Sequence, residues 1–458
     1  MNQLPTAYID QMKRLLGEAG FFAYENSLLE PVTRALRVNL LRRPDGVPPC
    51  EIEGLGAPVP WAKGAYFVEG DARPGLHPLH EGGLYYLQEP SALSAVSALD
   101  PKPHERVLDL CAAPGGKSSQ IAALMQGRGL LVCNEPVPAR AQILSRNIER
   151  MGVRNAVVTS AMPDQLAPRF PSFFDRILVD APCSGEGMFR RQPEARDEWS
   201  ENSPRGCADR QIEILIEAAK MLAPGGVMVY STCTFNDTEN EGVLARFLEI
   251  HPEFILQPIS LPGLPDGSRG YIHLYPHEIR GEGHFVSLLH KSGDAPVHVD
   301  PYTTEQDAPR RGKAQRGKTP AKKAPQQIDL PDVLAPGIEL GRLHAAGGSL
   351  WALPGGLDTT ARLDGLRVLR TGLLLAHIEG KRAEPDHALA MALAPHEAAR
   401  SAELTYEQAL SYQAGEAIDL GDLPAGYTLL THRSVSLGFG KQAGGVMKNH
   451  YPKGLRRR

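Results

Sequence analysis

The sequence of 458 residues contains no long apolar run, which limits where the protein can reside. No stretch reaches the roughly 18 apolar residues that a membrane-spanning helix needs. The N-terminal residues, MNQLPTAYIDQMKRLLGEAG, are polar and amphipathic and lack the apolar centre of a secretory signal. With 42% apolar and 22% charged residues the composition is ordinary for a globular protein. We therefore expect a cytoplasmic protein with no membrane partner.

None of the six cysteines lies two or three residues from another, which excludes the spacing of zinc ribbons and thioredoxin-like redox sites. We accordingly expect no metal ion. In a cytosolic chain the six residues should be reduced thiols, and each is either a small buried side chain or a reactive centre. They are Cys50, Cys111, Cys133, Cys183, Cys207 and Cys233.

The motifs GxGxxG and GxxxxGK[ST] are also missing, which argues against a dinucleotide or a nucleoside triphosphate as the ligand. The net charge of −4 does not by itself indicate a nucleic-acid partner. The charge is uneven, however, because residues 309–325 hold seven basic side chains and no acidic one, and the C-terminus, KNHYPKGLRRR, is basic. Such local basic patches favour a polyphosphate partner such as RNA.

The chain divides into four parts by composition and pattern. Residues 1–100 read as a small α+β domain, with a helix at 6–18 and a strand at 34–43. Residues 101–292 alternate between strands and helices. Residues 293–330 are rich in Pro, Lys, Arg and Gln and predict a flexible basic linker, and residues 331–458 predict a separate small α+β domain that binds RNA.

The alternation predicts an α/β fold with a doubly wound parallel sheet, which is a Rossmann-like core. Ligands of such sheets bind at the carboxyl ends of the strands, where the topology switches. The expected strands are 106–111, 129–135, 155–160, 174–182, 226–232 and 283–291. One expected helix starts at residue 117, and the others cover 137–151, 208–222 and 237–250.

The first strand of this series runs into VLDLCAAPGGK, residues 107–117. Its small residues let a ligand approach the backbone, and the following helix start offers free N–H groups. Glu135 falls at the end of the second strand, where a carboxylate can accept hydrogen bonds from both hydroxyls of a ribose. This combination favours a nucleoside ligand without phosphates.

Two cysteines follow two further strands. Cys183 lies in DAPCSGEG after the fourth strand, and Cys233 lies in YSTCTF after the fifth. Most cysteines are inert, but two at the same edge of one sheet indicate catalysis. Asp180 of the first motif can accept a hydrogen bond from an exocyclic amine, as on the edge of cytosine. We interpret the other four cysteines as structural.

A thiol is what methylation at carbon 5 of cytosine requires. Carbon 5 is a poor nucleophile, but addition of a thiolate to carbon 6 makes it enamine-like and able to attack a sulfonium methyl group. A base then removes the hydrogen on carbon 5 and the thiol leaves. Transfer of a methyl group to nitrogen needs no thiol, and enzymes of that class typically carry (D/N)PPY where this chain has DAPC.

VLDLCAAPGGK, DAPCSGEG and STCT together resemble the RNA 5-methylcytosine methyltransferases, which include bacterial ribosomal RNA enzymes and eukaryotic nucleolar and tRNA enzymes. The resemblance covers residues 1 to about 290, with LRVN (36–39) and YYLQEPSA (85–92). The segments YPHEIRGEGHF (275–285) and LGFGKQAGGVMKNHYPKGLR resemble a subgroup that acts on 16S rRNA of the small ribosomal subunit, either as RNA or in the assembled 30S particle.

The resemblance implies an enzyme that uses S-adenosylmethionine, with Cys233 as the nucleophile and Cys183 in product release. Asp180 is assigned to the donor or to cytosine, and these alternatives stay open. The residues implied for donor binding are Cys111, Ala112, Ala113, Pro114, Gly115, Gly116, Lys117, Glu135 and Asp180.

The chain departs from the family after the third strand, where a carboxylate usually lies near the adenine. Ala161 and Met162 stand there instead, so Asp164 or backbone groups take over that contact. Two other functions stay open, an RNA-binding assembly factor with an inactive methyltransferase domain and a tRNA methyltransferase. Nothing in the sequence requires more than a monomer.

Other conspicuous residues have simpler explanations. We expect the aromatic residues of YYLQEP to pack in the interior and His284 to be structural. Contact with RNA and plain surface are equally compatible with the basic and aromatic residues near the C-terminus, which are Lys448, Asn449, His450, Tyr451 and Lys453.

Overall fold

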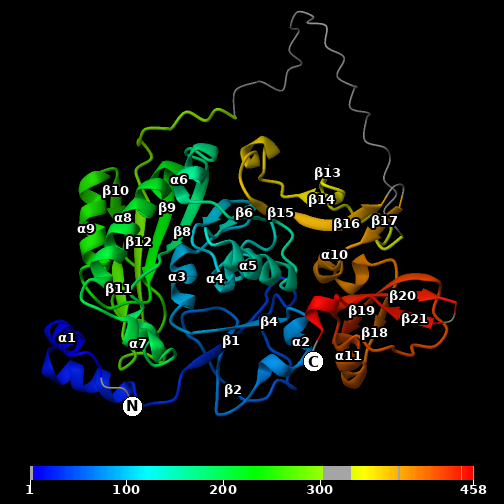
Figure 1. The fold of residues 1–458 in the computed structure, drawn as a ribbon, viewed down its shortest axis with the longest axis horizontal. Coiled ribbons are helices and arrows are strands. Elements are labelled where there is room, and N and C mark those ends of the chain that lie inside the picture. Colours follow the sequence, from blue (N-terminus) through cyan, green and yellow to red (C-terminus); the bar gives the residue numbers. More distant parts are fainter. Residues whose placement is uncertain (1–3, 303–331, 380–381, 445, 457–458) are drawn as a thin grey trace, which may run out of the picture.

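The computed structural model describes residues 4–302, 332–379, 382–444 and 446–456. Three regions follow one another along the chain, an N-terminal sheet with a long helix, a central α/β core, and a C-terminal part with two small sheets (Figure 1). The basic segment 309–325 that the sequence singles out lies outside the described residues.

A nine-stranded sheet forms the core, in the order β10-β12-β9-β8-β5-β6-β7-β15 with β11 paired to β12. The five neighbours from β9 to β7 are parallel, and all residues of β6 and β7 are buried, as expected for strands covered on both faces. The strands are β5 (Arg106–Asp109), β6 (Leu130–Asn134), β7 (Ala156–Thr159), β8 (Phe174–Asp180), β9 (Leu222–Thr232), β10 (Phe254–Leu256), β11 (Tyr271–Leu274), β12 (His284–Lys291) and β15 (Val368–Thr371).

Helices cover both faces of this sheet. Side chains of α8 and α9 pack on one face with Leu108 and Tyr230, while those of α3, α4 and α5 pack on the other with Val107 and Val229 (Figure 1). The three layers confirm the predicted Rossmann-like core. The helices of this region are α3 (Leu93–Leu99), α4 (Gly116–Leu124), α5 (Pro138–Arg150), α6 (Pro163–Leu166), α7 (Glu194–Glu198), α8 (Ser203–Met221) and α9 (Asn240–Ile250).

The N-terminal region departs from the expected elements at two points. The helix predicted for 6–18 is α1 (Thr6–Ser27), in which Gly17, with a φ of 71°, joins two helical segments. The strand predicted for 34–43 ends at residue 38, because the Asn39 side chain accepts from the Leu41 N–H and turns the chain. The antiparallel sheet has the order β2 (Leu55–Pro58), β3 (Ala65–Val68), β1 (Arg34–Val38), β4 (Tyr85–Gln88), and α2 is Pro78–Glu81.

The C-terminal region is less separate than the sequence predicts, because β15 pairs with β7 and extends the core sheet. The remaining elements form two four-stranded sheets, and the Arg154 guanidinium of the core binds the Glu397 carboxylate beside them. These elements are β13 (Arg342–Ala346), β14 (Ser349–Leu353), β16 (Leu373–Glu379), β17 (Arg382–Pro385), α10 (His387–Ala392), β18 (Ser401–Glu403), α11 (Tyr406–Ala414), β19 (Gly426–His432), β20 (Val435–Ala443) and β21 (Val446–Asn449).

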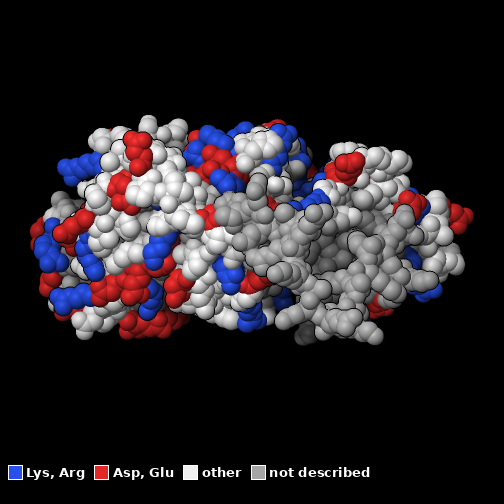
Figure 2. Space-filling view, turned by 90° about the horizontal axis from the view of Figure 1, so that it is seen from above, with Lys and Arg blue, Asp and Glu red and all other residues white. Residues whose placement is uncertain are grey.

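The surface of the described residues carries charges of both signs. Figure 2 shows acidic and basic side chains interspersed on the face seen from above, so the described part of that face has no broad basic field that would mark a path for RNA. Among the described residues, no helix combines the length and the apolarity needed to cross a bilayer.

Candidate active site

The two cysteines singled out by the sequence meet at one edge of the core sheet. The chain passes from β5 through β6 to β7 and then resumes at β8 on the other side of β5, so the topology switches between β5 and β8. Cys183 follows the carboxyl end of β8, Cys233 follows that of β9, and the two Sγ atoms are 3.3 Å apart. A thiol pair therefore lies where this class of sheet places its reacting groups.

The Cys183 thiol is held in its protonated form. Its pKa is raised well above the ordinary value, first by the hydrogen bond with Cys233, then by burial and by negative charge on Cys233 and Glu239. Two of these causes, the hydrogen bond with Cys233 and its negative charge, depend on Cys233 having a free sulfur.

Beside the thiols, Lys117 and Asp180 form a buried ion pair. The Lys117 Nζ atom donates to Asp180 Oδ2 at 2.7 Å, and Asp180 Oδ1 accepts from Ser231 Oγ at 2.8 Å. Burial opposes the charge on Asp180, but Lys117 and His284 hold the pKa of this carboxyl well below its usual range. Negative charge on Asp180 and Cys233 outweighs burial and raises the pKa of Lys117. The site thus presents a fixed carboxylate and an ammonium within electrostatic reach of Cys233.

His284, expected to be structural, belongs to this group. It is buried, and its Nε2 atom lies 3.5 Å from Asp180 Oδ1. The distance is too long for a good hydrogen bond, and Nε2 has no other partner among the described residues. His284 therefore contributes to the electrostatics of Asp180 rather than only to packing.

The loop 111–117 is clamped by its neighbours in a shape that only small residues permit. Gly115 has a φ of 110°, and a Cβ on Gly116 would lie 3.0 Å from the Tyr86 ring. The Asn147 amide of α5 donates to the Pro114 carbonyl at 2.8 Å, and Arg37 donates to the Gly116 carbonyl at 3.0 Å. Because Arg37 and Tyr86 come from the LRVN and YYLQEP segments, the N-terminal sheet completes this loop.

Two carboxylates lie behind this loop. Asp109 is fully buried, its Oδ2 atom accepts from Ser118 Oγ at 2.6 Å, and its Oδ1 atom has no hydrogen-bond partner among the described residues. Burial raises the pKa of Asp109 to about 7, with Asp180 and Glu135 adding to the shift. Glu135, buried directly after β6, accepts from the Val137 N–H at 3.0 Å and lies 3.4 Å from Arg140. An unpartnered buried carboxylate oxygen at a small-residue loop fits a cationic ligand.

After β7, the chain offers little backbone to a ligand. The Ala161 N–H donates to the Asn134 side chain, and the Met162 N–H donates to the Gln165 side chain. Met162 is 54% exposed, and Val137, after the neighbouring strand, is 47% exposed. Asp164 is exposed in the first turn of α6.

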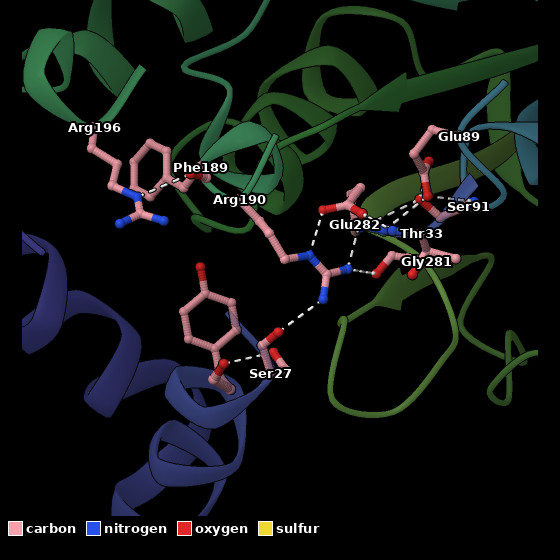
Figure 3. A network of polar contacts seen from close by, with 11 residues as sticks. Ser27, Thr33, Glu89, Ser91, Phe189, Arg190, Arg196, Gly281 and Glu282 are labelled. Carbon is pink, nitrogen blue, oxygen red and sulfur yellow. Dashed lines mark hydrogen bonds and ion pairs between the residues drawn. The ribbon is translucent and has the colours of Figure 1, made fainter. Parts of the chain in front are cut away.

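The loop after Cys183 is anchored by a second buried ion pair (Figure 3). Arg190 donates to both oxygens of Glu282 at 2.7 and 2.9 Å and to the carbonyls of Ser27 and Gly281. The Glu282 N–H in turn donates to Glu89 of the QEPSA segment. The segments QEPSA and GEGHF therefore tie the N-terminal region to the loop that bears Cys183.

Sequence reasoning missed two buried acids beside the cysteines, Glu186 and Glu239. Both are fully buried, and they accept hydrogen bonds from the two cysteine-bearing loops. Glu186 lies within the DAPCSGEG motif, and its place in that motif could have marked it as a functional residue. Glu239 belongs to none of the recognised motifs, and only the fold brings it beside Ser184.

The remaining candidates pack in the interior or stay on the surface. Burial raises the pKa of Cys111, Cys133 and Cys207, the last to about 11, and Cys50 is exposed. Tyr85 is buried, as expected for its segment. No group of three or more potential metal ligands occurs among the described residues.

Near the C-terminus, two of the residues considered for RNA contact are used for folding. Tyr451 is buried against the rings of His387 and Tyr412, and the Asn449 amide donates to carbonyls at the end of α11. Base stacking on Tyr451 is therefore excluded in this conformation. Lys448 and Lys453 remain exposed.

Sequence comparisons cover nearly the whole described chain. Residues 96–290 match the family described as 16S rRNA methyltransferase RsmB/F, and residues 4–90 match the N-terminal domain of 16S rRNA methyltransferase RsmF. Residues 330–393 match the RsmF rRNA methyltransferase first C-terminal domain, and residues 399–457 match the methyltransferase RsmF PUA domain.

Full-length relatives agree with these matches. A ribosomal RNA small subunit methyltransferase F from Erwinia tasmaniensis is 33% identical over 475 residues, covering 98% of this chain and 96% of the relative. One from Escherichia coli is 32% identical over 472 residues with the same coverage.

Solved structures resemble about two thirds of this chain. A methyltransferase homolog protein from Pyrococcus horikoshii has a TM-score of 0.55 and 29% identity, covering 63% of this chain and 95% of that one. NSun6 from the same organism, solved with SFG, also has a TM-score of 0.55, with 23% identity and coverage of 63% and 98%, which supports the fold alone.

Proposed function

We propose, because this chain belongs to the 16S rRNA methyltransferase RsmB/F family, that it methylates carbon 5 of cytosine in 16S rRNA through a covalent bond between Cys233 and carbon 6. That it is a ribosomal RNA small-subunit methyltransferase, using S-adenosylmethionine, follows from the family. The proposal about the atom and the mechanism rests on one observation, the two thiols 3.3 Å apart at the carboxyl ends of β8 and β9.

In the proposed reaction the Cys233 thiolate adds to carbon 6 and the electrons of the ring double bond move to carbon 5. S-adenosylmethionine supplies the methyl cation equivalent that carbon 5 attacks. Asp180, ionised and fixed by Lys117 and Ser231, is suited to accept a hydrogen bond from the exocyclic amine of cytosine. Loss of the proton on carbon 5 then restores the double bond and expels Cys233 as thiolate.

We assign the release step to Cys183. While Cys233 is bonded to carbon 6, it neither hydrogen-bonds to Cys183 as a thiolate nor carries charge, so two causes of the raised Cys183 pKa disappear. Formation of the adduct thereby makes Cys183 easier to deprotonate at the moment when a base is required.

The residues present fit the methyl donor. The loop 111–117 and the first-turn N–H groups of α4 would hold its methionine part, and Glu135 would accept from its ribose hydroxyls. β6 and β7 are neighbouring strands whose last residues, Asn134 and Thr159, are paired with each other. Val137 follows Asn134 by the same number of residues as Met162 follows Thr159, so the two side chains occupy equivalent positions after the two strands. Their exposed apolar side chains would contact the adenine, with Asp164 as the polar partner.

Asp109 gives the donor affinity a pH dependence. A pKa of about 7 in the folded protein lies above the ordinary carboxyl value, so between about pH 4 and 7 the folded chain holds one more proton than the unfolded chain. The donor carries a sulfonium and an ammonium group, which favour the ionised carboxylate. Binding therefore releases this proton, and we expect affinity to rise about threefold to tenfold from pH 6 to pH 8.

Calorimetric titration with S-adenosylmethionine at several pH values measures this slope. Asp109→Asn should flatten it, whereas Asp10→Asn, an exposed carboxyl on α1, should leave it as in the parent protein. A slope unchanged in Asp109→Asn would assign the effect to another group.

The function is tested by bisulfite sequencing of unmodified 16S rRNA, small ribosomal subunits and tRNA after incubation with the protein and S-adenosylmethionine. Newly protected cytosines in 16S rRNA or in the subunit are the expected result, and they identify the target. Protection in tRNA alone would assign a different substrate. Methyl incorporation without any protected cytosine would contradict methylation at carbon 5.

A further inference from the structure

The loop that carries Cys233 is held by a buried carboxylate. Glu186 Oε2 accepts from the backbone N–H groups of Phe235 at 2.8 Å and Asn236 at 3.0 Å. Its Oε1 accepts from the Gln11 amide of α1 at 2.8 Å and from the Trp199 indole at 3.2 Å. The loop beyond the nucleophile is thus fastened to the N-terminal helix through one fully buried side chain.

A second buried carboxylate holds the loop that carries Cys183. Glu239 accepts from the backbone N–H of Ser184 at 3.2 Å, from the Ser184 hydroxyl and from the Gln211 amide at 2.7 Å. The Asn236 amide lies between the two acids, 3.2 Å from Glu186 Oε1 and 2.8 Å from Glu239 Oε1. An acid–amide–acid bridge therefore spans both cysteine loops.

The bridge contains two carboxylates but no cationic hydrogen-bond partner among the described residues. Every described hydrogen-bond partner of Glu186 and Glu239 is neutral, although both side chains are fully buried. Burying a carboxylate is costly unless several well-placed donors compensate, so the donors must keep their positions. Burial also raises the pKa of Glu239, with the charge on Glu186 adding to the shift.

The two loops also touch directly, so a shift of one moves the other. The Gly187 N–H donates to the Cys233 carbonyl at 2.8 Å, and a Cβ on Gly187 would lie 2.9 Å from that oxygen. Glu186 precedes Gly187 in the chain, so its carboxylate sets this contact as well as the N–H groups beyond Cys233.

From this geometry we infer that Glu186 is a positioning residue, which holds the Cys233 loop against α1 in the orientation for attack on cytosine without touching the substrate. The inference rests on the proposed role of Cys233. It also gives the N-terminal helix a part in the reaction, through Gln11.

The test compares Glu186→Gln with Glu198→Gln, an exposed acid on α7 that undergoes the same change. Five donor groups point at the two carboxylate oxygens of Glu186. In Glu186→Gln an NH2 group replaces one of these two acceptor oxygens. We expect kcat for methylation of 16S rRNA to fall about tenfold to a hundredfold, the size of effect that misplacing a reacting group causes. KM for the RNA and the affinity for S-adenosylmethionine should match those of Glu198→Gln.

Alkylation by iodoacetamide reports on the same loop without RNA. Peptide mass spectrometry gives the rate at Cys233 relative to exposed Cys50, and Glu186→Gln should change this ratio about threefold or more if the loop is displaced. The double variant Gln11→Glu with Glu186→Gln places the carboxylate on the other partner, so it should recover part of the lost kcat, which a merely destabilised fold would not.

Methylation and alkylation equal to those of Glu198→Gln would overturn the inference. If Glu186→Gln fails to fold, Gln11→Met removes only one donor, and we expect kcat about threefold lower; unchanged kcat and unchanged Cys233 alkylation would then be equally decisive against it. Full activity of Cys233→Ala would instead refute the proposed function, while the alkylation ratio would still show whether Glu186 holds this loop.

Discussion

Cys233→Ala is expected to abolish methylation of 16S rRNA while leaving the affinity for S-adenosylmethionine nearly unchanged. Without the thiol, carbon 6 has no nucleophile and carbon 5 keeps its low reactivity. We expect a loss of about a thousandfold or more, because removing a nucleophile eliminates the covalent route rather than weakening it. The donor loop 111–117 is clamped by α5 and Arg37, which the substitution does not touch.

Incorporation of labelled methyl groups into unmodified 16S rRNA measures the turnover, and calorimetry measures donor binding. Cys50→Ala is the matched control, because it removes an exposed thiol from the N-terminal region. Residual turnover close to that of Cys50→Ala would refute Cys233 as the nucleophile. Loss of donor binding together with turnover would show that the substitution damages the site as a whole.

Much of the core and the meeting of the two cysteines followed from the sequence. The strands β6 and β7 are almost wholly apolar and each strand from β5 to β9 is followed by a helix, so the parallel order and its carboxyl edge could be anticipated. Cys183 and Cys233 follow the ends of β8 and β9, and neighbouring parallel strands bring their carboxyl ends together.

What the sequence could not reveal depends on contacts between distant segments. Gln11 meets Glu186 across 175 positions, and no local pattern signals that pairing. The short strands β10 and β11 escaped prediction because strand propensity is weak and pairing with β12 decides their conformation. β15 escaped for a similar reason, since its partner β7 lies some two hundred residues earlier.

Cys183→Ala is expected to trap the covalent protein–RNA intermediate. Attack by Cys233 and methyl transfer do not require the second thiol, but removal of the proton on carbon 5 does under our assignment. The adduct should therefore accumulate to a large fraction of the enzyme, whereas turnover stops after about one event per enzyme molecule.

A denaturing gel with labelled 16S rRNA fragments detects this adduct as a slowly migrating band that survives heat and disappears with nuclease. The double variant Cys183→Ala with Cys233→Ala is the control, because it lacks the sulfur that forms the bond. In the wild-type enzyme, adduct formation removes the hydrogen bond with Cys233 that keeps Cys183 protonated, so Cys183 can act as the base and little adduct should remain at steady state. If Cys183→Ala binds RNA and donor yet forms no adduct, then either the bond to carbon 6 does not form or another group releases it.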